Sequence, residues 1–343
     1  YGGKGGALLY PFENYQEEIY ELVRSRDYRE ALGLPESVEE EYRFLAAGEY
    51  NANLCFTHPI TGRKLLLRLN YGSQMQLSDQ IGYEARALRI LEKSGRTPKL
   101  WYADGSKRFL PRGILVMDFL PGRPLDYGRD LHSAAEILSD IHALRMDRDC
   151  GLLCPEDSVS ELLLECGRLL LPYREKVGGE SAERILQLYE KAVREAKRER
   201  MREGARSIIN TELNSGNFLI NSAPERSYLI DWEKPIYGLP AQDLGHFLAP
   251  TTSFWKSDVI LSSEERARFL SHYLSLSEGR FDCAHIREDT ERFLRLNCIR
   301  GLCWCAMAYT KYREGGGGES FEKIKAYLRD PFLSCVEEIW ASA

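Results

Sequence analysis

Hydrophobic and polar positions follow two different patterns along this chain. In the first third, short apolar stretches are separated by turn residues such as Pro59 and Gly62, a pattern typical of β-strands. Apolar residues recur every three or four positions over 13–31 and 78–92, which predicts one helix before the strands and one among them. The strands themselves are predicted over 44–57, 64–69, 98–103 and 113–119.

From residue 131 onward the pattern is mainly helical. Pro121-Gly122-Arg123-Pro124 reads as a loop and is the predicted hinge between a lobe of residues 1–120 and a lobe of residues 121–343. The expected fold class is α+β, with a small antiparallel sheet in the first lobe and mainly helices in the second. Helices are predicted over 131–144, 158–171 and 181–202, a strand pair over 217–220 and 227–231, and further helices to the end.

Composition and charge narrow the classes of function. A chain of 343 residues suits two lobes, and 43% hydrophobic with 29% charged residues is an ordinary globular balance. The net charge of −6 gives no bulk attraction to nucleic acid or to an anionic membrane, so neither is expected as a partner. No apolar run approaches the ~20 residues of a membrane span, no signal peptide is recognised, and a cytoplasmic location is expected. No oligomeric state is indicated.

Three further features are expected to be structural. The nine cysteines lack paired CxxC spacing and are predicted to be reduced thiols. The basic run 197–202 is interrupted by Glu199 and is expected to be a solvated helix face. Gly315–Gly318 lies between two predicted helices, which favours a surface connection over a phosphate-binding loop.

The strongest chemical signal is formed by Glu212, Asn217 and Asp231. A carboxylate, an amide five residues later and a second carboxylate after an apolar strand are typical of phosphoryl transfer. Glu212 is the candidate to orient an attacking hydroxyl and accept its proton. Asn217 and Asp231 supply the hard oxygen ligands that Mg²⁺ prefers. These three are the predicted catalytic residues, and Asn217 and Asp231 the predicted metal ligands.

A second group precedes it in the first lobe. Arg68 ends an apolar strand and Glu84 lies sixteen residues later in the following helix, so the cation is expected to bind phosphates while the carboxylate fixes its orientation. Asn51 and Asn53 lie where a loop would cover the phosphates, and they suit a plain hairpin turn equally well.

Two other polar residues are expected to be structural. Asp243, on a predicted helix start, is expected to brace the catalytic loop by accepting backbone N–H bonds, with a plain helix cap as the alternative. His142 lies on an apolar helix face and is expected to be a satisfied core histidine.

In these motifs the chain resembles the superfamily of aminoglycoside phosphotransferases and choline kinases. Asn210-Thr211-Glu212-Leu213-Asn214-Ser215-Gly216-Asn217 aligns without a gap to that family's His-Gly-Asp-(Leu/Phe)-His-x-Gly-Asn loop. Ile230-Asp231-Trp232-Glu233 and Asp243-Leu244-Gly245 match the next two family motifs. Leu66-Leu67-Arg68-Leu69 and Tyr83-Glu84-Ala85 are similar to its third strand and following helix.

The resemblance implies a two-lobed, protein-kinase-like fold and a small-molecule kinase. Such an enzyme would use ATP, or GTP, with Mg²⁺ to phosphorylate a hydroxyl of a small metabolite. Leu115-Val116-Met117-Asp118-Phe119-Leu120 is similar to the family's adenine-binding hinge, which implies that Met117, Asp118 and Phe119 offer backbone groups to the nucleotide.

The chain departs from the family pattern at the centre of the loop. Asn210, Thr211 and Glu212 stand where the family has His, Gly and Asp. Glutamate carries its carboxylate roughly 1–1.5 Å further than aspartate, and an error of ~1 Å can cost about a hundredfold in rate. A nucleotide-binding protein with a regulatory role is therefore the alternative hypothesis, and nucleotidyl transfer or protein phosphorylation is a third.

The acceptor is less defined by the sequence. A quaternary ammonium needs an aromatic cage, for which Trp255, Trp304 and Tyr309 are candidates, although helical aromatics usually fill cores. A polycationic aminoglycoside needs an acidic pocket, and no acidic cluster is clearly placed to form one.

Overall fold

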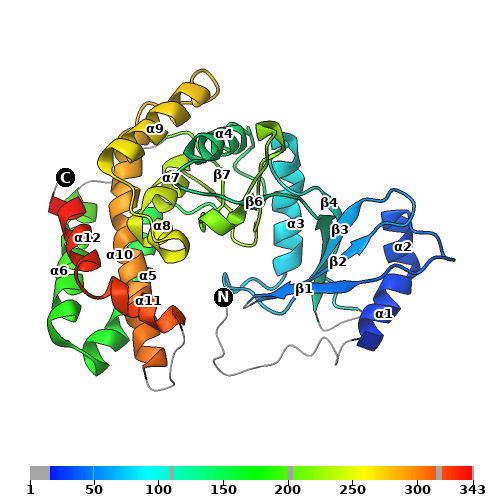
Figure 1. The fold of residues 1–343 in the computed structure, drawn as a ribbon, viewed down its shortest axis with the longest axis horizontal. Coiled ribbons are helices and arrows are strands. Elements are labelled where there is room, and N and C mark those ends of the chain that lie inside the picture. Colours follow the sequence, from blue (N-terminus) through cyan, green and yellow to red (C-terminus); the bar gives the residue numbers. More distant parts are fainter. Residues whose placement is uncertain (1–15, 49, 109–111, 199–203, 314–318, 342–343) are drawn as a thin grey trace.

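The computed structural model describes residues 16–341 except 49, 109–111, 199–203 and 314–318. The glycine run, most of the basic run, Glu49 and the first residues of the leading helix lie outside these ranges. The chain forms a sheet-containing lobe followed by a larger helical lobe, as predicted (Figure 1). No described helix has both the length and the apolar character needed to cross a lipid bilayer.

The first lobe is built on a five-stranded antiparallel sheet in the order β1-β2-β3-β5-β4. Side chains alternate between its faces, so Leu65 and Leu67 pack on one side while Leu66 and Arg68 point to the other. The predicted stretch 44–57 is a hairpin of two strands. The strands are β1 (Arg43–Ala47), β2 (Asn51–Thr57), β3 (Lys64–Asn70), β4 (Leu100–Asp104) and β5 (Gly113–Asp118).

Helices cover both faces of this sheet (Figure 1). The predicted leading helix is two helices, α1 (Gln16–Arg24) and α2 (Arg26–Leu32), because the backbone of Ser25 is extended and its side chain caps α2. Both pack against one face of the sheet. Helix α3 (Gln80–Leu91) lies on the other face and joins the core of the second lobe.

Short strands carry the chain from the sheet to the helical lobe. The large sheet ends at Asp118, and β6 (Arg123–Pro124) already pairs with β8 (Phe218–Ile220), which also pairs with β9 (Tyr228–Leu229). A separate two-stranded ladder joins β7 (Ser207–Ile209) to β10 (Ile236–Gly238). These ladders hold both ends of the segments that carry the predicted catalytic residues.

The helical lobe is organised around α10 (Ile286–Tyr312), which packs against α5 and α7. At Gly245 in α7, a Cβ atom would lie 2.6 Å from the Leu294 backbone nitrogen, so this close approach of α7 and α10 requires glycine. The remaining helices are α4 (Leu131–His142), α5 (Ser158–Lys176), α6 (Gly179–Arg198), α7 (Pro240–Leu248), α8 (Pro250–Ser257), α9 (Ser263–Ser277), α11 (Glu319–Tyr327) and α12 (Phe332–Ala341).

Candidate active site

A buried carboxylate holds the loop that follows β7. Asp243, in the first turn of α7, is fully buried and accepts hydrogen bonds from the backbone N–H groups of Asn210 and Thr211, both at 2.7 Å. His142 donates or accepts at 3.4 Å from Asp243 Oδ2 and bonds the Tyr273 hydroxyl at 2.8 Å. Asp243 is therefore a brace, and His142 a satisfied core histidine, as predicted.

The brace yields a first testable expectation. Asp243→Asn leaves one acceptor oxygen for two buried N–H groups, so it should lower the free energy of unfolding by about 1–3 kcal/mol. The loop would also shift, and turnover should fall by about a hundredfold. Urea unfolding and turnover on the same preparation measure both effects.

The matched control is Asp282→Asn. Asp282 is exposed and accepts one backbone N–H, from Ala284 at 3.0 Å. The free energy of unfolding of Asp282→Asn should stay within about 0.5 kcal/mol of that of the parent. Equal effects at both positions would contradict the bracing role of Asp243.

Glu212 points into the site and is held by a lysine. The Nζ of Lys234 lies 2.7 Å from Glu212 Oε1, and the Glu212 side chain is 33% exposed. Burial works to raise the pKa of Glu212, but Lys234, followed by Arg300 and His246, outweighs it and lowers that pKa. The carboxylate is therefore ionised at neutral pH, with Lys234 bound to one oxygen.

The backbone of this loop is held in a rare conformation. Thr211 has a φ of 70°, a left-handed value that is unfavourable for a β-branched residue. Its hydroxyl donates to the Lys234 carbonyl at 2.9 Å, and Asp243 holds its N–H. Such strain persists where surrounding contacts over-determine the backbone, commonly at functional sites.

Asn217 and Asp231 lie together because β8 pairs with β9. The Ile230 N–H donates to the Asn217 carbonyl at 2.8 Å, and the Asn217 side-chain amide donates to the Glu212 carbonyl at 3.1 Å. This contact fixes the amide and leaves Asn217 Oδ1 as the atom available to a cation. Asp231 has a φ of 67° and lines the cleft, with 40% of its side chain exposed.

The predicted Arg68–Glu84 pair forms and reaches Asp231. Arg68 Nη1 lies 2.6 Å from Glu84 Oε1 and 3.8 Å from Asp231 Oδ1, and both members of the pair are buried. Burial opposes the charge of Arg68, but Glu84, Asp231 and Glu233 outweigh it and raise the pKa of Arg68. A cation is thereby held beside the loop that carries Asp231.

The two predicted asparagines do not face open solvent as a phosphate-covering loop would. Asn53 lies opposite Arg68 in the sheet and accepts from Arg68 Nε at 3.2 Å. Asn51 is buried, accepts from Asn70 at 2.8 Å and donates to the Glu233 carboxylate. Asn53 therefore orients Arg68, and Asn51 joins β2 to the segment after Asp231.

Two backbone N–H groups of the predicted hinge are already hydrogen-bonded within the first lobe. The N–H of Asp118 donates to the Lys99 carbonyl at 3.0 Å, and that of Phe119 donates to the Lys64 carbonyl at 3.1 Å. The Met117 side chain is buried in the core that includes α3. These two N–H groups are thus not free for a nucleotide, whereas Leu120 N–H has no acceptor among the described residues.

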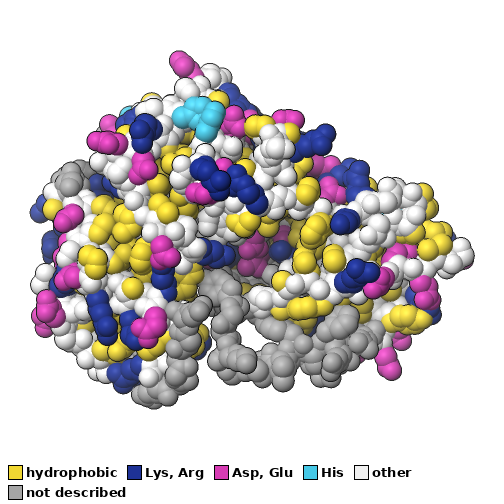
Figure 2. Space-filling view, in the orientation of Figure 1, with side chains coloured by type: hydrophobic (Ala, Val, Ile, Leu, Met, Phe, Trp, Pro, Cys, Tyr) yellow, Lys and Arg dark blue, Asp and Glu magenta, His cyan; other side chains and the backbone are white. Residues whose placement is uncertain are grey.

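The carboxylates at the site make it suited to a cation. Burial and the Glu212 carboxylate raise the pKa of Asp231, while burial and Asp231 raise the pKa of Glu233 to about 8. The Glu212 and Asp231 carboxylates thus lie near each other, and a divalent cation bound by Asn217 Oδ1 and Asp231 would relieve their repulsion. Figure 2 shows acidic and basic side chains together in the hollow between the two lobes.

The aromatic candidates are only partly brought together. Trp255 and Trp304 meet edge to face with ring centres 5.4 Å apart. Tyr309 instead packs against Tyr173 and Phe321. The three rings therefore do not surround one common space.

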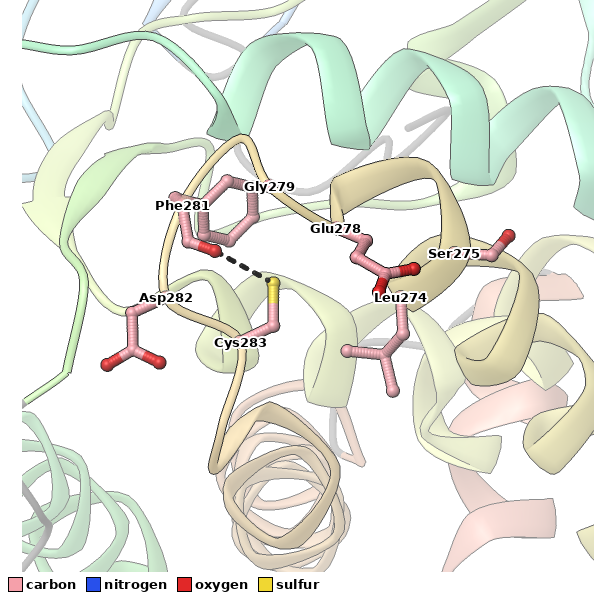
Figure 3. Close-up of a pocket in the computed structure, with 7 residues that line it drawn as sticks. All are labelled: Leu274, Ser275, Glu278, Gly279, Phe281, Asp282 and Cys283. Carbon is pink, nitrogen blue, oxygen red and sulfur yellow. Dashed lines mark hydrogen bonds between the residues drawn. The ribbon is translucent and has the colours of Figure 1, made fainter.

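A separate surface pocket lies at the end of α9, away from these residues (Figure 3). Cys283 lines it and donates its thiol to the Phe281 carbonyl at 3.4 Å. Burial, then Asp282 and Glu278, raise the pKa of Cys283, so the thiol stays protonated. No chemistry is assigned to this pocket.

Four residues at the site were not singled out from the sequence: Leu120, Glu233, Lys234 and Lys256. Glu233 and Lys234 directly follow Asp231, so their position beside the metal motif was the available signal. No sequence signal pointed to Lys256, on α8, because its position depends on how α8 packs beside residues 215–217.

Comparisons with known proteins show which folds resemble this one. A crystal structure of a proposed aminoglycoside phosphotransferase from Ralstonia eutropha JMP134 superposes with a TM-score of 0.66 at 14% identity, over 96% of this chain and 98% of that one. The ethanolamine kinase of Plasmodium vivax gives 0.60 at 15% identity, over 89% and 86%. Spectinomycin phosphotransferase, in complex with ADP and spectinomycin, gives 0.60 at 15%, over 95% and 97%.

These likenesses confirm the two-lobed kinase-like fold. No curated protein matches the sequence. The model of the phosphotransferase enzyme family, however, matches residues 41–284 of the 343. The chain therefore belongs to the phosphotransferase enzyme family, a family of small-molecule kinases.

Proposed function

We propose that this protein transfers the γ-phosphate of ATP to a hydroxyl group of a small metabolite. The observation that carries the proposal is the continuous arrangement of Glu84, Arg68 and Asp231, with Glu212 and Asn217 on the adjoining loop. Phosphoryl transfer depends mainly on positioning and on stabilising charge. Four of these residues provide fixed charges of both signs in one cleft, and Asn217 adds an amide oxygen.

Nucleotide binding is assigned to the first lobe and the hinge. Arg68, oriented by Glu84 and Asn53, is the phosphate-binding cation. The free N–H of Leu120 is the donor available to the purine, together with carbonyls of the segment Met117–Phe119. The likeness to spectinomycin phosphotransferase, whose structure contains ADP, supports a nucleotide in this cleft.

Asn217 Oδ1 and the Asp231 carboxylate would hold Mg²⁺ together with phosphate oxygens and water. When bound, such an ion neutralises phosphate charge during transfer. Glu212 provides the base: its Oε1 is held by Lys234, which leaves Oε2 for the acceptor hydroxyl.

The acceptor oxygen forms a bond to the γ-phosphorus as the bond from that phosphorus to the β,γ-bridging oxygen breaks, and ADP leaves. The hydroxyl proton passes to Glu212, which accepts it late because the transition state is loose.

We also place the enzyme in the cytoplasm. All nine cysteines are free thiols, as predicted, and ATP and thiol-reducing conditions occur together there. Its partners are then the nucleotide and a small hydroxyl compound, with no nucleic acid or membrane required.

Calorimetry with Mg·ATP and Mg·GTP, followed by ADP or GDP release over a panel of small alcohols, tests the proposal. We expect binding with an affinity in the range of about 1 μM to 1 mM and turnover on at least one class of alcohol. Absence of nucleotide binding would refute the proposal. Binding without turnover on any alcohol would favour a regulatory nucleotide-binding role instead.

A further inference from the structure

The charge around the acceptor position restricts what the acceptor can be, and this inference rests on the proposed function. The acceptor hydroxyl must reach Glu212 Oε2 beside Asn217 and Asp231. On the side formed by the helical lobe, the groups near that position include three cations and one histidine. They are Lys234, His246, Lys256 and Arg300.

Lys256 is the clearest of these groups. It extends from α8 toward the catalytic loop, and its Nζ would lie 2.8 Å from a Cβ atom placed on Gly216. The ammonium is close enough to Asp231 to lower the pKa of that carboxyl, against the stronger effect of burial. Its side chain is exposed and makes no ion pair with a described residue. A positive charge is therefore available in the cleft.

Arg300 adds a second cation from α10. Its guanidinium binds Glu165 at 3.0 and 3.3 Å and is near enough to Glu212 to lower the pKa of that carboxyl. Glu165, the acid in contact with this group, is therefore already paired. Burial, followed by Arg300, lowers the pKa of His246 to about 4, so His246 is a neutral hydrogen-bonding group at pH 7.

A cationic acceptor would meet the like charge of Lys256 on the side of the cleft formed by α8. The ammonium of Lys256 repels a polyamine or a quaternary ammonium. The Trp255 and Trp304 rings meet each other edge to face, so they do not form an aromatic cage for such a cation. We infer that the acceptor is an alcohol bearing an anionic group, a carboxylate or a phosphate, which Lys256 recognises while its hydroxyl faces Glu212.

The test compares alcohols of one size and different charge. Glycerate, glycerol 3-phosphate, glycerol and 2-amino-1,3-propanediol are assayed for turnover with Mg·ATP and for binding to the Mg·ADP complex. We expect the anionic probes to bind and react best, and the two anionic arms separate carboxylate from phosphate recognition. Lys256→Gln should lower kcat/KM for the preferred anion by about 10- to 100-fold, mainly through KM, with KM for ATP unchanged.

Lys323→Gln is the matched control. Lys323 also lies beside α8, but its ammonium is already paired with Asp258. The Lys323→Gln variant should keep the acceptor preference of the parent. The Lys256→Glu variant should shift that preference toward the cationic probe. The inference is overturned if a neutral or cationic probe binds best, or if Lys256→Gln raises KM for ATP instead. If the unaltered protein does not bind Mg·ATP, the proposed function itself is refuted. Failure of the acceptor inference and failure of the proposed function are therefore distinguishable.

Discussion

Asp231→Asn is expected to lower kcat by about 10³-fold while leaving the fold intact. The amide keeps the shape of the side chain, and asparagine tolerates the left-handed φ of 67° at this position. It removes the negative charge that would bind the cation and that faces Arg68 at 3.8 Å. Loss of one such preorganised charge typically costs 10²–10³ in rate, and loss of the metal increases the cost.

The same variant should be at least as stable as the parent without nucleotide. Burial raises the pKa of Asp231 above the ordinary 3.8, so on raising the pH the unfolded chain releases this proton before the folded protein does. The carboxyl therefore lowers stability as the pH rises past that range, and the amide does not. Unfolding of both proteins at pH 4 to 8, beside ADP release and Mg²⁺-dependent nucleotide binding, measures the contrast.

Asp258→Asn controls for the backbone effect of this change. Asp258 also has a left-handed φ, 55°, but its side chain is exposed and pairs with Lys323. Its kcat should stay close to that of the parent. If Asp231→Asn kept more than about a tenth of the activity, the proposed role of Asp231 as a metal ligand would be contradicted.

The candidate site could be predicted where its residues are close in sequence or lie on one element. Glu212 and Asn217 share one loop, and Asp231 follows β9, the strand that pairs with β8, by two residues, so spacing alone brought them together. Arg68 and Glu84 lie on a strand and the helix that follows it, and they meet at 2.6 Å. Hydrophobic periodicity also gave most helices, because each buries one face.

Features that depend on register or on distant packing could not be predicted. Asn53 bonds Arg68 because the β2–β3 register places them opposite each other, and the same register turns Asn51 toward Glu233. The strands β7 and β10 have three residues each, too few to show alternation. The N–H groups of Asp118 and Phe119 are occupied because the end of β5 lies beside the carbonyls of Lys99 and Lys64.

Two of the three departures of the loop from the family pattern meet at Lys234. Lys234 accepts from the Thr211 hydroxyl through its carbonyl at 2.9 Å and binds the Glu212 carboxylate through its ammonium at 2.7 Å. Thr211 and Glu212 replace the usual glycine and aspartate. Lys234 thus holds the longer glutamate in a fixed position. This contact compensates for the displacement of the carboxylate that the extra methylene would otherwise cause.

Lys234→Met is therefore expected to lower kcat by about 10- to 100-fold, and Glu212→Gln by about 10²–10⁴. Because Lys234 holds the pKa of Glu212 below its ordinary 4.5, the methionine variant should raise that pKa. Glu212 acts as the ionised base, so activity is lost as the pH falls through its pKa. The acid limb of the pH–rate profile should accordingly move to higher pH in Lys234→Met, a shift that a purely structural lysine would not produce.

Lys191→Met is the control for losing a half-buried lysine, since Lys191 donates to the Trp340 carbonyl at 2.6 Å far from the loop. Glu212→Asp separates reach from charge: the shorter carboxylate loses Lys234, so Lys234→Met should cost much less in that background than alone. Additive losses in this double-mutant cycle, with an unmoved acid limb, would show that Lys234 does not position Glu212. A gain of activity in Glu212→Asp would mean that the acceptor site suits the shorter side chain.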